Sequence, residues 1–293
     1  MFETIIGQNK VKNQLIRAVQ AAKIGQTLLP HFLLSSGTGG TGKTMFIQAV
    51  SEEIGYPLIP MNANVCEPAH IIGSMINSRC VRPLIFLEEW NSKNEKLDFF
   101  LRPYMENGLL MADGITYSTN YLGTIAIATN NVSVLSQPLI SRLRIYQMDD
   151  YTHDEMLLIT RQHSDKLGLT LSDEVIDSIA SRSRSIPREV VKVLKVLAEH
   201  TLVSMRPPTI DETVTIMEEM GIYKDGFNTL DLKMMRMLAN AKELSLSAIC
   251  GATGESMETI RQHEAFLIKN GMLTIKTRRM LTKEGYDYIT NLS

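Results

Sequence analysis

The first half of the chain alternates short apolar runs with helical stretches, a pattern typical of a parallel α/β sheet. The predicted strands are His31–Ser35, Pro57–Asn62, Leu84–Glu88, Thr124–Ala128 and Arg144–Met148. Helices fit between these strands, for example Thr44–Ile54, which Gly55 ends as a C-cap. Asp113-Gly114 lies between two apolar stretches and predicts a β-hairpin turn. Residues 1–150 are therefore expected to form one α/β domain.

After Asp150 the strand pattern stops and only helical patterns follow. The predicted helices are Thr152–Leu167, Ser172–Arg184, Pro187–Ser204 and Thr209–Met220. Thr152 and Ser172 can cap helix N-termini, and Pro187 and Pro208 suit a helix start. Residues 151–224 are therefore expected to form a small helical domain. Gly221–Asn228, which contains two glycines, is expected to be a linker.

The last part of the chain, residues 225–293, has three short helical patterns and then an apolar–polar alternation around Met272–Ile289. Three helices followed by a hairpin are typical of a winged-helix domain, a relative of the helix-turn-helix. The expected fold class is therefore α/β, with a parallel-sheet domain, a helical domain and a C-terminal winged-helix domain.

The composition is that of an ordinary globular protein, with 293 residues, 44% hydrophobic and 21% charged. Cys66, Cys80 and Cys250 lie far apart without CxxC spacing, which argues against a disulfide framework or a zinc site and favours a cytoplasmic location. No apolar run reaches the roughly 18 residues of a membrane span, and no signal-peptide pattern is present. The formal net charge is -2, so any contact with nucleic acid must come from a local basic patch.

The segment Gly37–Thr44 matches the G-x-x-x-x-G-K-[ST] pattern of a P-loop. Its glycines allow backbone N–H groups to approach phosphates closely, and the following helix adds its positive N-terminal end. Lys43 is expected to reach the β- and γ-phosphates of ATP, and the Thr44 hydroxyl to bind Mg²⁺. A glycine-rich turn with a chance lysine is the alternative, but the predicted strand before and helix after this segment favour nucleotide binding.

An apolar strand ends at two adjacent carboxylates, Glu88 and Glu89. This arrangement predicts that Glu88 lies near Mg²⁺ and that Glu89 orients the water that attacks the phosphate. Most such motifs have Asp first, and the extra methylene of Glu88 favours a looser or water-mediated contact with the ion. Two carboxylates that merely end a strand in solvent are the alternative.

Further segments complete an ordered series with the P-loop. They are Phe2–Gln8, Thr124–Asn130, Gln137–Leu143, Asp150–Thr152, Arg182–Arg188, Glu264–Gly271 and Arg278–Thr282. This series resembles the AAA+ ATPases and, over nearly the whole chain, the RuvB family of Holliday-junction branch-migration motors. The resemblance implies an AAA+ P-loop ATPase domain at 1–150, a helical lid domain at 151–224 and a DNA-binding winged helix at 225–293.

The resemblance also implies a set of nucleotide-binding residues. They are Ile6, Gly7, Gly37, Gly39, Gly40, Gly42, Lys43, Thr44, Met45, Tyr151 and Pro187. In the family, backbone at the Ile-Gly pair lies near adenine and a Tyr at the start of the lid lies by the nucleotide. The chain starts close to this pair, so adenine contacts from the family's longer N-terminal extension are expected to be absent.

Three further residues are implied to act in catalysis. Asn130 falls on the polar tip of sensor 1, Arg142 on the arginine finger and Arg188 on the sensor 2 arginine that meets the γ-phosphate. Arginines suit these roles because a transferring phosphoryl group carries spread negative charge. Arg188 also lies in the first turn of a predicted helix, where the helix dipole disfavours a cation and an anionic ligand would compensate. A surface salt bridge at Arg142 and a structural ion pair at Arg188 are the alternatives, and Arg182 and Arg184 are expected at the solvated surface.

The C-terminal module is mildly basic, since residues 229–293 carry nine Lys and Arg against seven Asp and Glu. Lys276, Arg278 and Arg279 cluster on the predicted wing, where the resemblance implies contact with DNA phosphates. A solvated charged face on a protein-interaction module is the alternative. Arg261 and Gln262 lie on the predicted third helix, which would enter the major groove in a sequence-specific regulator.

Together these features predict a ring-forming, ATP-driven DNA motor with ATP and Mg²⁺ as cofactors, and the resemblance implies a hexamer. The predicted hairpin at Asp113-Gly114 is shorter than the family's protruding hairpin, which docks the junction-binding partner RuvA, so a RuvA-like partner stays an open question. A clamp-loader or helicase-loader ATPase and an ATP-switched winged-helix regulator are the alternative functions.

Overall fold

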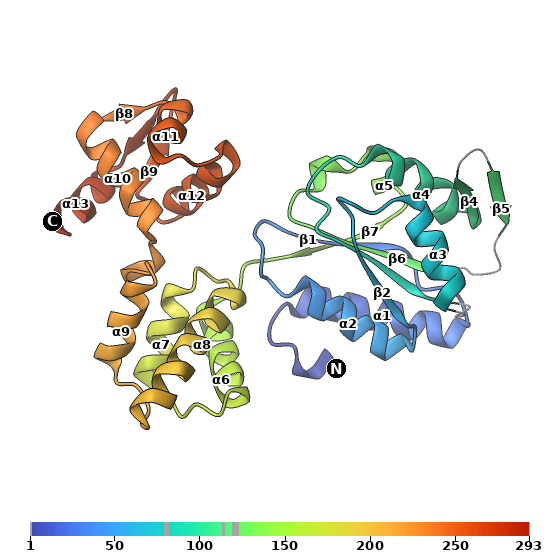
Figure 1. Cartoon of the computed structure of the whole chain (residues 1–293), viewed down its shortest axis with the longest axis horizontal. Coiled ribbons are helices and arrows are strands. Elements are labelled where there is room, and N and C mark those ends of the chain that lie inside the picture. The colour runs from blue at the N-terminus through green and yellow to red at the C-terminus, as the bar shows by residue number, and fades with distance from the viewer. Residues whose placement is uncertain (1, 79–81, 113–114, 119–122, 293) are drawn as a thin grey trace. The chain divides into compact units, whose positions relative to one another are not determined.

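The computed structural model describes residues 2–78, 82–112, 115–118 and 123–292 (Figure 1). The chain divides into two compact units. Unit 1 comprises residues 1–168 and 185–194, and unit 2 comprises residues 169–184 and 195–293. Helix α8 (Pro187–Ser204) belongs to both units. Among the described residues, no helix is long and apolar enough to cross a membrane.

Unit 1 contains a five-stranded parallel sheet with the order β2-β3-β6-β1-β7. Its strands are β1 (Phe32–Ser36), β2 (Leu58–Asn62), β3 (Leu84–Glu88), β6 (Thr124–Thr129) and β7 (Arg144–Met148). All five predicted strands are therefore present, each within one residue of its expected limits. Every residue of β1 and β6 is buried, as is typical of central strands covered by helices on both faces.

Helices cover both faces of this sheet (Figure 1). The helices of unit 1 that flank the sheet are α1 (Asn9–Gly25), α2 (Lys43–Ile54), α3 (Pro68–Ser78), α4 (Glu95–Asn107) and α5 (Gln137–Ile140). One apolar core joins α1 and α2 to side chains such as Phe32 and Phe86. A second core joins α3, α4 and α5 to Leu33 and Ile85, the neighbours of those two residues along the strands. This alternation follows from the period of two in a strand.

A short hairpin follows α4, as the sequence predicts. Strand β4 (Leu109–Ala112) pairs antiparallel with β5 (Ile115–Ser118). The expected turn residues Asp113 and Gly114 lie outside the described residues, as does Cys80.

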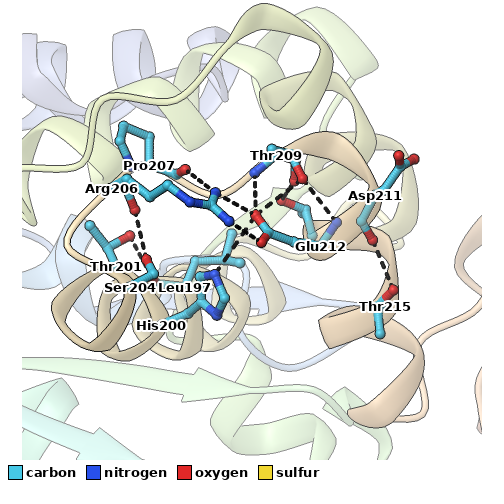
Figure 2. Close-up of polar contacts among 11 residues, drawn as sticks. Leu197, His200, Thr201, Ser204, Arg206, Pro207, Thr209, Asp211, Glu212 and Thr215 are labelled. Carbon is cyan, nitrogen blue, oxygen red and sulfur yellow. Dashed lines mark hydrogen bonds and ion pairs between the residues drawn. The ribbon is translucent and has the colours of Figure 1, made fainter.

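The helical patterns after Asp150 form α6 (His153–Lys166), α7 (Asp173–Arg182), α8 and α9 (Ile210–Glu219). Thr152 and Ser172 cap α6 and α7 as predicted, because each side chain accepts a hydrogen bond from the third backbone N–H of its helix. Figure 2 shows the connection from α8 to α9, where Arg206 donates to both carboxylate oxygens of Glu212 at 2.9 and 2.5 Å. Hydrogen bonds from Arg206 and from the Thr209 backbone lower the pKa of Glu212 to about 2.

The C-terminal part of unit 2 forms a winged helix. Its elements are η3 (Lys224–Gly226), α10 (Thr229–Ala241), β8 (Glu243–Leu244), α11 (Leu246–Thr253), α12 (Met257–Lys269), β9 (Leu273–Ile275), β10 (Arg279–Leu281) and α13 (Lys283–Asn291). The predicted alternation up to Ile289 is wrong beyond Leu281, because residues 283–291 are helical. Thr282 caps this helix by accepting from the Gly285 backbone N–H, and Gly285 and Ile289 are buried one helical turn apart.

The predicted linker Gly221–Asn228 is a packed part of unit 2. Ile222 and Asn228 form an isolated β-bridge, and Phe227 is fully buried. The Phe227 ring lies 5.7 Å from the ring of Phe266 and 5.0 Å from that of Tyr288. The linker prediction rested on glycine content, and it is wrong because the buried Phe227 side chain packs this segment against the winged-helix core.

Arg184 is also not at the solvated surface, in contrast to the expectation. Its guanidinium donates to the Gly226 carbonyl at 2.6 Å, pairs with the carboxylate of Asp231 and lies 4.1 Å from the ring centroid of Phe266. Asp231 is fully buried, and its carboxylate also contacts His263 Nδ1 at 2.6 Å and accepts from the Asn228 backbone N–H at 2.8 Å. This buried network connects the end of α7 to the winged helix within unit 2.

Loss of the Asp231 carboxylate is expected to destabilise unit 2. Asp231→Ala leaves the Arg184 cation buried without its anion, and removing one partner of a buried pair typically costs about 3 kcal/mol or more. The matched control is Glu243→Ala, because Glu243 pairs with Arg278 at 3.3 Å on the exposed surface and such pairs contribute about 0–1 kcal/mol. Native-state hydrogen exchange of α10 and α12 measures both, and equal protection in the two variants would contradict the expectation.

Candidate nucleotide-binding site

Unit 1 contains a cavity of about 300 Å³ at the carboxyl edge of the parallel sheet. Its lining residues are Gly39, Gly40, Thr41, Gly42, Lys43, Thr44, Met45, Glu88, Glu89, Asn91, Ala128, Thr129, Asn130, His163, Pro187, Arg188 and Val191. The P-loop, both adjacent carboxylates, Asn130 and the start of α8 therefore surround one space. The sequence places these segments far apart, and the parallel strands bring them together.

The P-loop runs from the end of β1 into α2. Gly40 and Gly42 have φ of 79° and 96°, a region that side-chain-bearing residues avoid. A Cβ on Gly40 would also come within 2.7 Å of Arg188 Cβ. Glycine at this position therefore allows the loop to pass close to the start of α8. Gly37 begins the loop and does not line the cavity.

Lys43 is the first residue of α2, and its ammonium points back over the loop. Nζ donates to Ser36 Oγ at 2.6 Å and to Asn130 Oδ1 at 2.5 Å. Burial and, as the smaller cause, the positive charge of Arg188 lower the pKa of Lys43 to about 8. The two cations line the same cavity, and an anionic ligand would relieve the repulsion between them.

The two carboxylates leave β3 in different conformations. Glu88 is the last residue of the strand and is half-buried, whereas Glu89 is exposed and has a left-handed backbone with φ of 55°. Glu89 Oε2 accepts a hydrogen bond from Asn62 Nδ2 at 3.1 Å. Among the described residues, no three His, Cys, Asp or Glu side chains form a metal cluster. A magnesium ion held by Thr44 and Glu88 would therefore take further ligands from phosphate and water.

The residues expected near adenine lie beside the P-loop and do not line the cavity. The Tyr151 hydroxyl donates to the Thr41 carbonyl at 2.9 Å, and burial raises the pKa of Tyr151 to about 12. Gly7 has φ of 68°, and a Cβ there would lie 3.1 Å from the Tyr151 ring and 2.6 Å from Glu155 Oε1. Ile6 precedes Gly7 and also lies outside the lining. This segment nevertheless packs against the same residue, Tyr151, that contacts the loop.

Arg142 lies apart from the cavity. It follows α5, and its guanidinium pairs with Glu106 at 2.6 Å and donates to the Pro138 carbonyl at 2.6 Å. The salt bridge that the sequence left as an alternative for Arg142 is thus present in the single chain.

Asn91, His163 and Val191 line the cavity and were not singled out from the sequence. Val191 lies four residues after Pro187 on α8, so helical spacing could have indicated it. Burial and the positive charge of Lys166 lower the pKa of His163 below its usual value. No sequence pattern identifies His163 or Asn91, because their positions depend on tertiary packing.

The three expected DNA-contacting residues lie on the β9–β10 hairpin of unit 2. Lys276 and Arg278 are exposed, and Arg278 pairs with Glu243 at 3.3 Å. The side chain of Arg279 is only 16% exposed and donates through Nε to Glu264 at 2.6 Å, and Glu264 itself is buried. Arg279 therefore holds the wing to α12, a role that the sequence did not predict.

Family models match both ends of the chain. The Holliday junction DNA helicase RuvB P-loop domain matches residues 1–148, and the RuvB C-terminal winged helix domain matches residues 224–290. Curated relatives include the Holliday junction branch migration complex subunit RuvB of Helicobacter acinonychis, 29% identical over 93% of this chain and 84% of that protein. The same subunit of a Nitratiruptor species is 29% identical over 98% of this chain and 90% of that protein.

Solved structures share the fold. The Thermotoga maritima RuvB Holliday junction branch migration motor is 24% identical, with a TM-score of 0.83 over 97% of this chain and 95% of that one. A point mutant of the same protein gives a TM-score of 0.85 over 99% and 97% of the two chains. The parallel sheet, the P-loop and the paired carboxylates define a nucleotide-binding P-loop ATPase of the AAA+ class. Within that class, the chain belongs to the RuvB family.

Nucleotide binding is expected to take up a proton at mildly alkaline pH. The pKa of Lys43 is about 8 in the free protein, and a bound phosphate raises it because the anion favours the charged form. Well below that pKa Lys43 is already protonated, so no proton is taken up. As the pH rises above about 8, binding requires protonation and the affinity falls. Calorimetry in buffers of different ionisation enthalpy measures this uptake.

Lys43→Arg is the matched variant, because a guanidinium stays charged throughout this pH range. Whatever binding this variant retains should occur without the uptake. Equal proton uptake by wild type and Lys43→Arg would show that another group is responsible.

Proposed function

We propose that this protein is a ring-forming, ATP-driven DNA motor that acts on four-way junctions. The observation that carries the proposal is the convergence of Lys43, Glu88, Glu89, Asn130 and Arg188 on one cavity. Two cations, two carboxylates and the side-chain amide of Asn130 form a set suited to phosphoryl transfer. Relatives that match nearly the whole chain are named as Holliday junction branch migration subunits. Their name supports the same substrate here.

ATP would supply the γ-phosphoryl group whose transfer to water releases energy. Backbone N–H groups of the P-loop and the Lys43 ammonium bind its phosphates. Thr44 and Glu88 hold Mg²⁺, and Glu89 orients water for attack. Arg188 lies directly beside Gly40 at the cavity, where it would stabilise charge on the γ-phosphate. The rest of the nucleotide would lie against Met45 and Pro187, which line the cavity. Ile6, Gly7 and Tyr151 lie outside this lining and would contact the adenine end.

Arg142 would act on the nucleotide of a neighbouring subunit. It lies outside the cavity of its own chain, on the segment between α5 and β7, so catalysis by Arg142 requires a second copy. A homo-oligomeric ring, a hexamer in the family, provides such a neighbour. In the isolated chain the Arg142 guanidinium pairs with Glu106. When the ring assembles, Arg142 would leave Glu106 and bind the phosphate of the neighbour's nucleotide.

Lys276 and Arg278 would provide the wing's DNA contacts, because both are exposed and phosphate contacts need no base recognition. Arg279 contributes by fixing the wing through Glu264. A RuvA-like partner would dock on the β4–β5 hairpin. A loader ATPase and a winged-helix regulator remain the alternatives, but both family models, at opposite ends of the chain, favour the motor.

Mixed rings test the proposed action of Arg142 in trans. Arg142→Ala subunits and Lys43→Ala subunits should each be inactive, and mixing them should restore part of the ATP turnover. Each mixed ring contains some interfaces in which an intact P-loop meets an intact Arg142. The measurement is turnover against mixing ratio, with co-assembly shown by size. Failure at every ratio in proven mixed rings would assign Arg142 a role within its own chain.

Salt dependence tests DNA binding by the wing. Each phosphate contact contributes about 0.9 to the log–log slope of affinity against salt on duplex DNA. Changing Lys276 and Arg278 to Ala should therefore flatten the slope by about two units and weaken all sequences equally. The matched control changes Lys233 and Arg236, two exposed cations on α10. An unchanged slope in the wing variant, or the same loss in the control, would reject contact by the wing.

A further inference from the structure

The turn after β3 holds Glu89 in a conformation that its own side chain disfavours. Glu89 has φ of 55°, in the left-handed region that favours glycine. The next residue, Trp90, is fully buried, and its carbonyl accepts from the Thr129 hydroxyl at 2.7 Å. The packing of Trp90 therefore fixes the turn after Glu89, whereas Glu89 itself is exposed and needs a separate restraint.

Asn64 provides that restraint from the loop that follows β2. Its Nδ2 donates to the Glu89 carbonyl at 2.6 Å. Its Oδ1 accepts from the backbone N–H groups of Asn91 and Ser92, both at 3.2 Å, and from the Ser92 hydroxyl at 3.0 Å. One amide group thus binds a carbonyl before Trp90 and two N–H groups after it. Asn64 does not line the cavity, so it acts on the turn and not on a bound nucleotide.

We infer that Asn64 is a positioning residue for Glu89, an inference that rests on the proposed hydrolysis of ATP. The direction of a side chain follows its backbone angles, so a turn that relaxes to negative φ would carry the Glu89 carboxylate away from the attacking water. The role requires a donor and an acceptor on one short planar group, which an asparagine supplies and an alanine does not.

The contact between Asn62 and Glu89 is a different one. Asn62 Nδ2 reaches the carboxylate itself, so it competes with any other partner of that carboxylate. Asn64 reaches only backbone at Glu89, so it fixes the turn without engaging the reacting group. Removing Asn64 should therefore lower turnover without changing the binding of nucleotide.

The test compares Asn64→Ala with Glu89→Gln and with the double variant. Because a misplacement of about 1 Å can cost on the order of 100-fold in rate, Asn64→Ala should lower kcat by roughly 10- to 100-fold. Its Kd for ATP should stay that of wild type. Glu89→Gln should also keep the Kd and lose most turnover. In single-turnover measurements, adding Asn64→Ala to Glu89→Gln should cause little further loss, because the turn then has no working carboxylate to position.

A matched control and a second measurement separate positioning from general loosening. Asn131→Ala removes another exposed asparagine whose Oδ1 accepts from the Ser133 backbone and hydroxyl, in the turn after β6. This variant should keep the wild-type kcat. Hydrogen exchange of a peptide covering residues 88–92 should be faster in Asn64→Ala, because the Asn91 and Ser92 N–H groups lose their acceptor.

Several results would overturn the inference, and they differ from failure of the proposed function. A wild-type kcat in Asn64→Ala, an equal loss in Asn131→Ala, or a full further loss in the double variant would each remove Asn64 from the role. Unchanged hydrogen exchange at residues 88–92 in Asn64→Ala would also remove Asn64 from the role, even if no ATP turnover were measured. Normal turnover in Glu89→Gln, or none in wild type, would instead reject hydrolysis at this site.

Discussion

Parallel pairing of β1, β6 and β3 is the constraint on which the candidate site depends. β6 pairs with β1 on one side and with β3 on the other, so the carboxyl ends of all three strands lie at one edge of the sheet. The P-loop leaves β1 there, the two carboxylates end β3 there, and Asn130 follows β6 there. The Lys43–Asn130 hydrogen bond shows how closely segments distant in sequence approach at that edge.

Charge is the second feature of this edge. Lys43, which is half-buried, and Arg188 line the same cavity, and the lowered pKa of Lys43 reflects the cost of holding a cation there beside a second cation. Phosphate would restore the balance. Glu88 and Glu89 line the same cavity and repel phosphate unless a divalent cation lies between them and the phosphate. The arrangement of charges therefore favours a phosphate with a bound metal ion over either one alone.

Much of the fold could be predicted from the sequence because local signals were strong. Apolar runs predicted the five strands, and side-chain caps such as Thr152 predicted the helix starts. The failures at Arg184 and Arg279 share one cause, which is a tertiary partner that no local pattern shows. Arg184 and Arg279 read as surface cations until Asp231 and Glu264 are seen to be buried beside them.

The candidate site shows the same division. The P-loop and the carboxylate pair follow from motif spacing, since a few residues in sequence carry all the information. Asn64, in contrast, acts through hydrogen bonds to a turn 25 to 28 residues away, and His163 reaches the cavity only because α6 packs there. Asn64 and His163 could not be predicted because their contacts form only once distant segments of the chain have folded against each other.

The most direct test of the proposed motor is the rate of ATP turnover with a four-way junction, with linear duplex and with no DNA. The account predicts that the junction accelerates turnover the most. It also predicts that Lys43→Ala abolishes turnover in all three conditions and that changing Lys276 and Arg278 to Ala removes the acceleration but leaves the DNA-free rate. Turnover that no DNA changes, measured in a protein that hydrolyses ATP, would contradict the proposed coupling between this site and DNA.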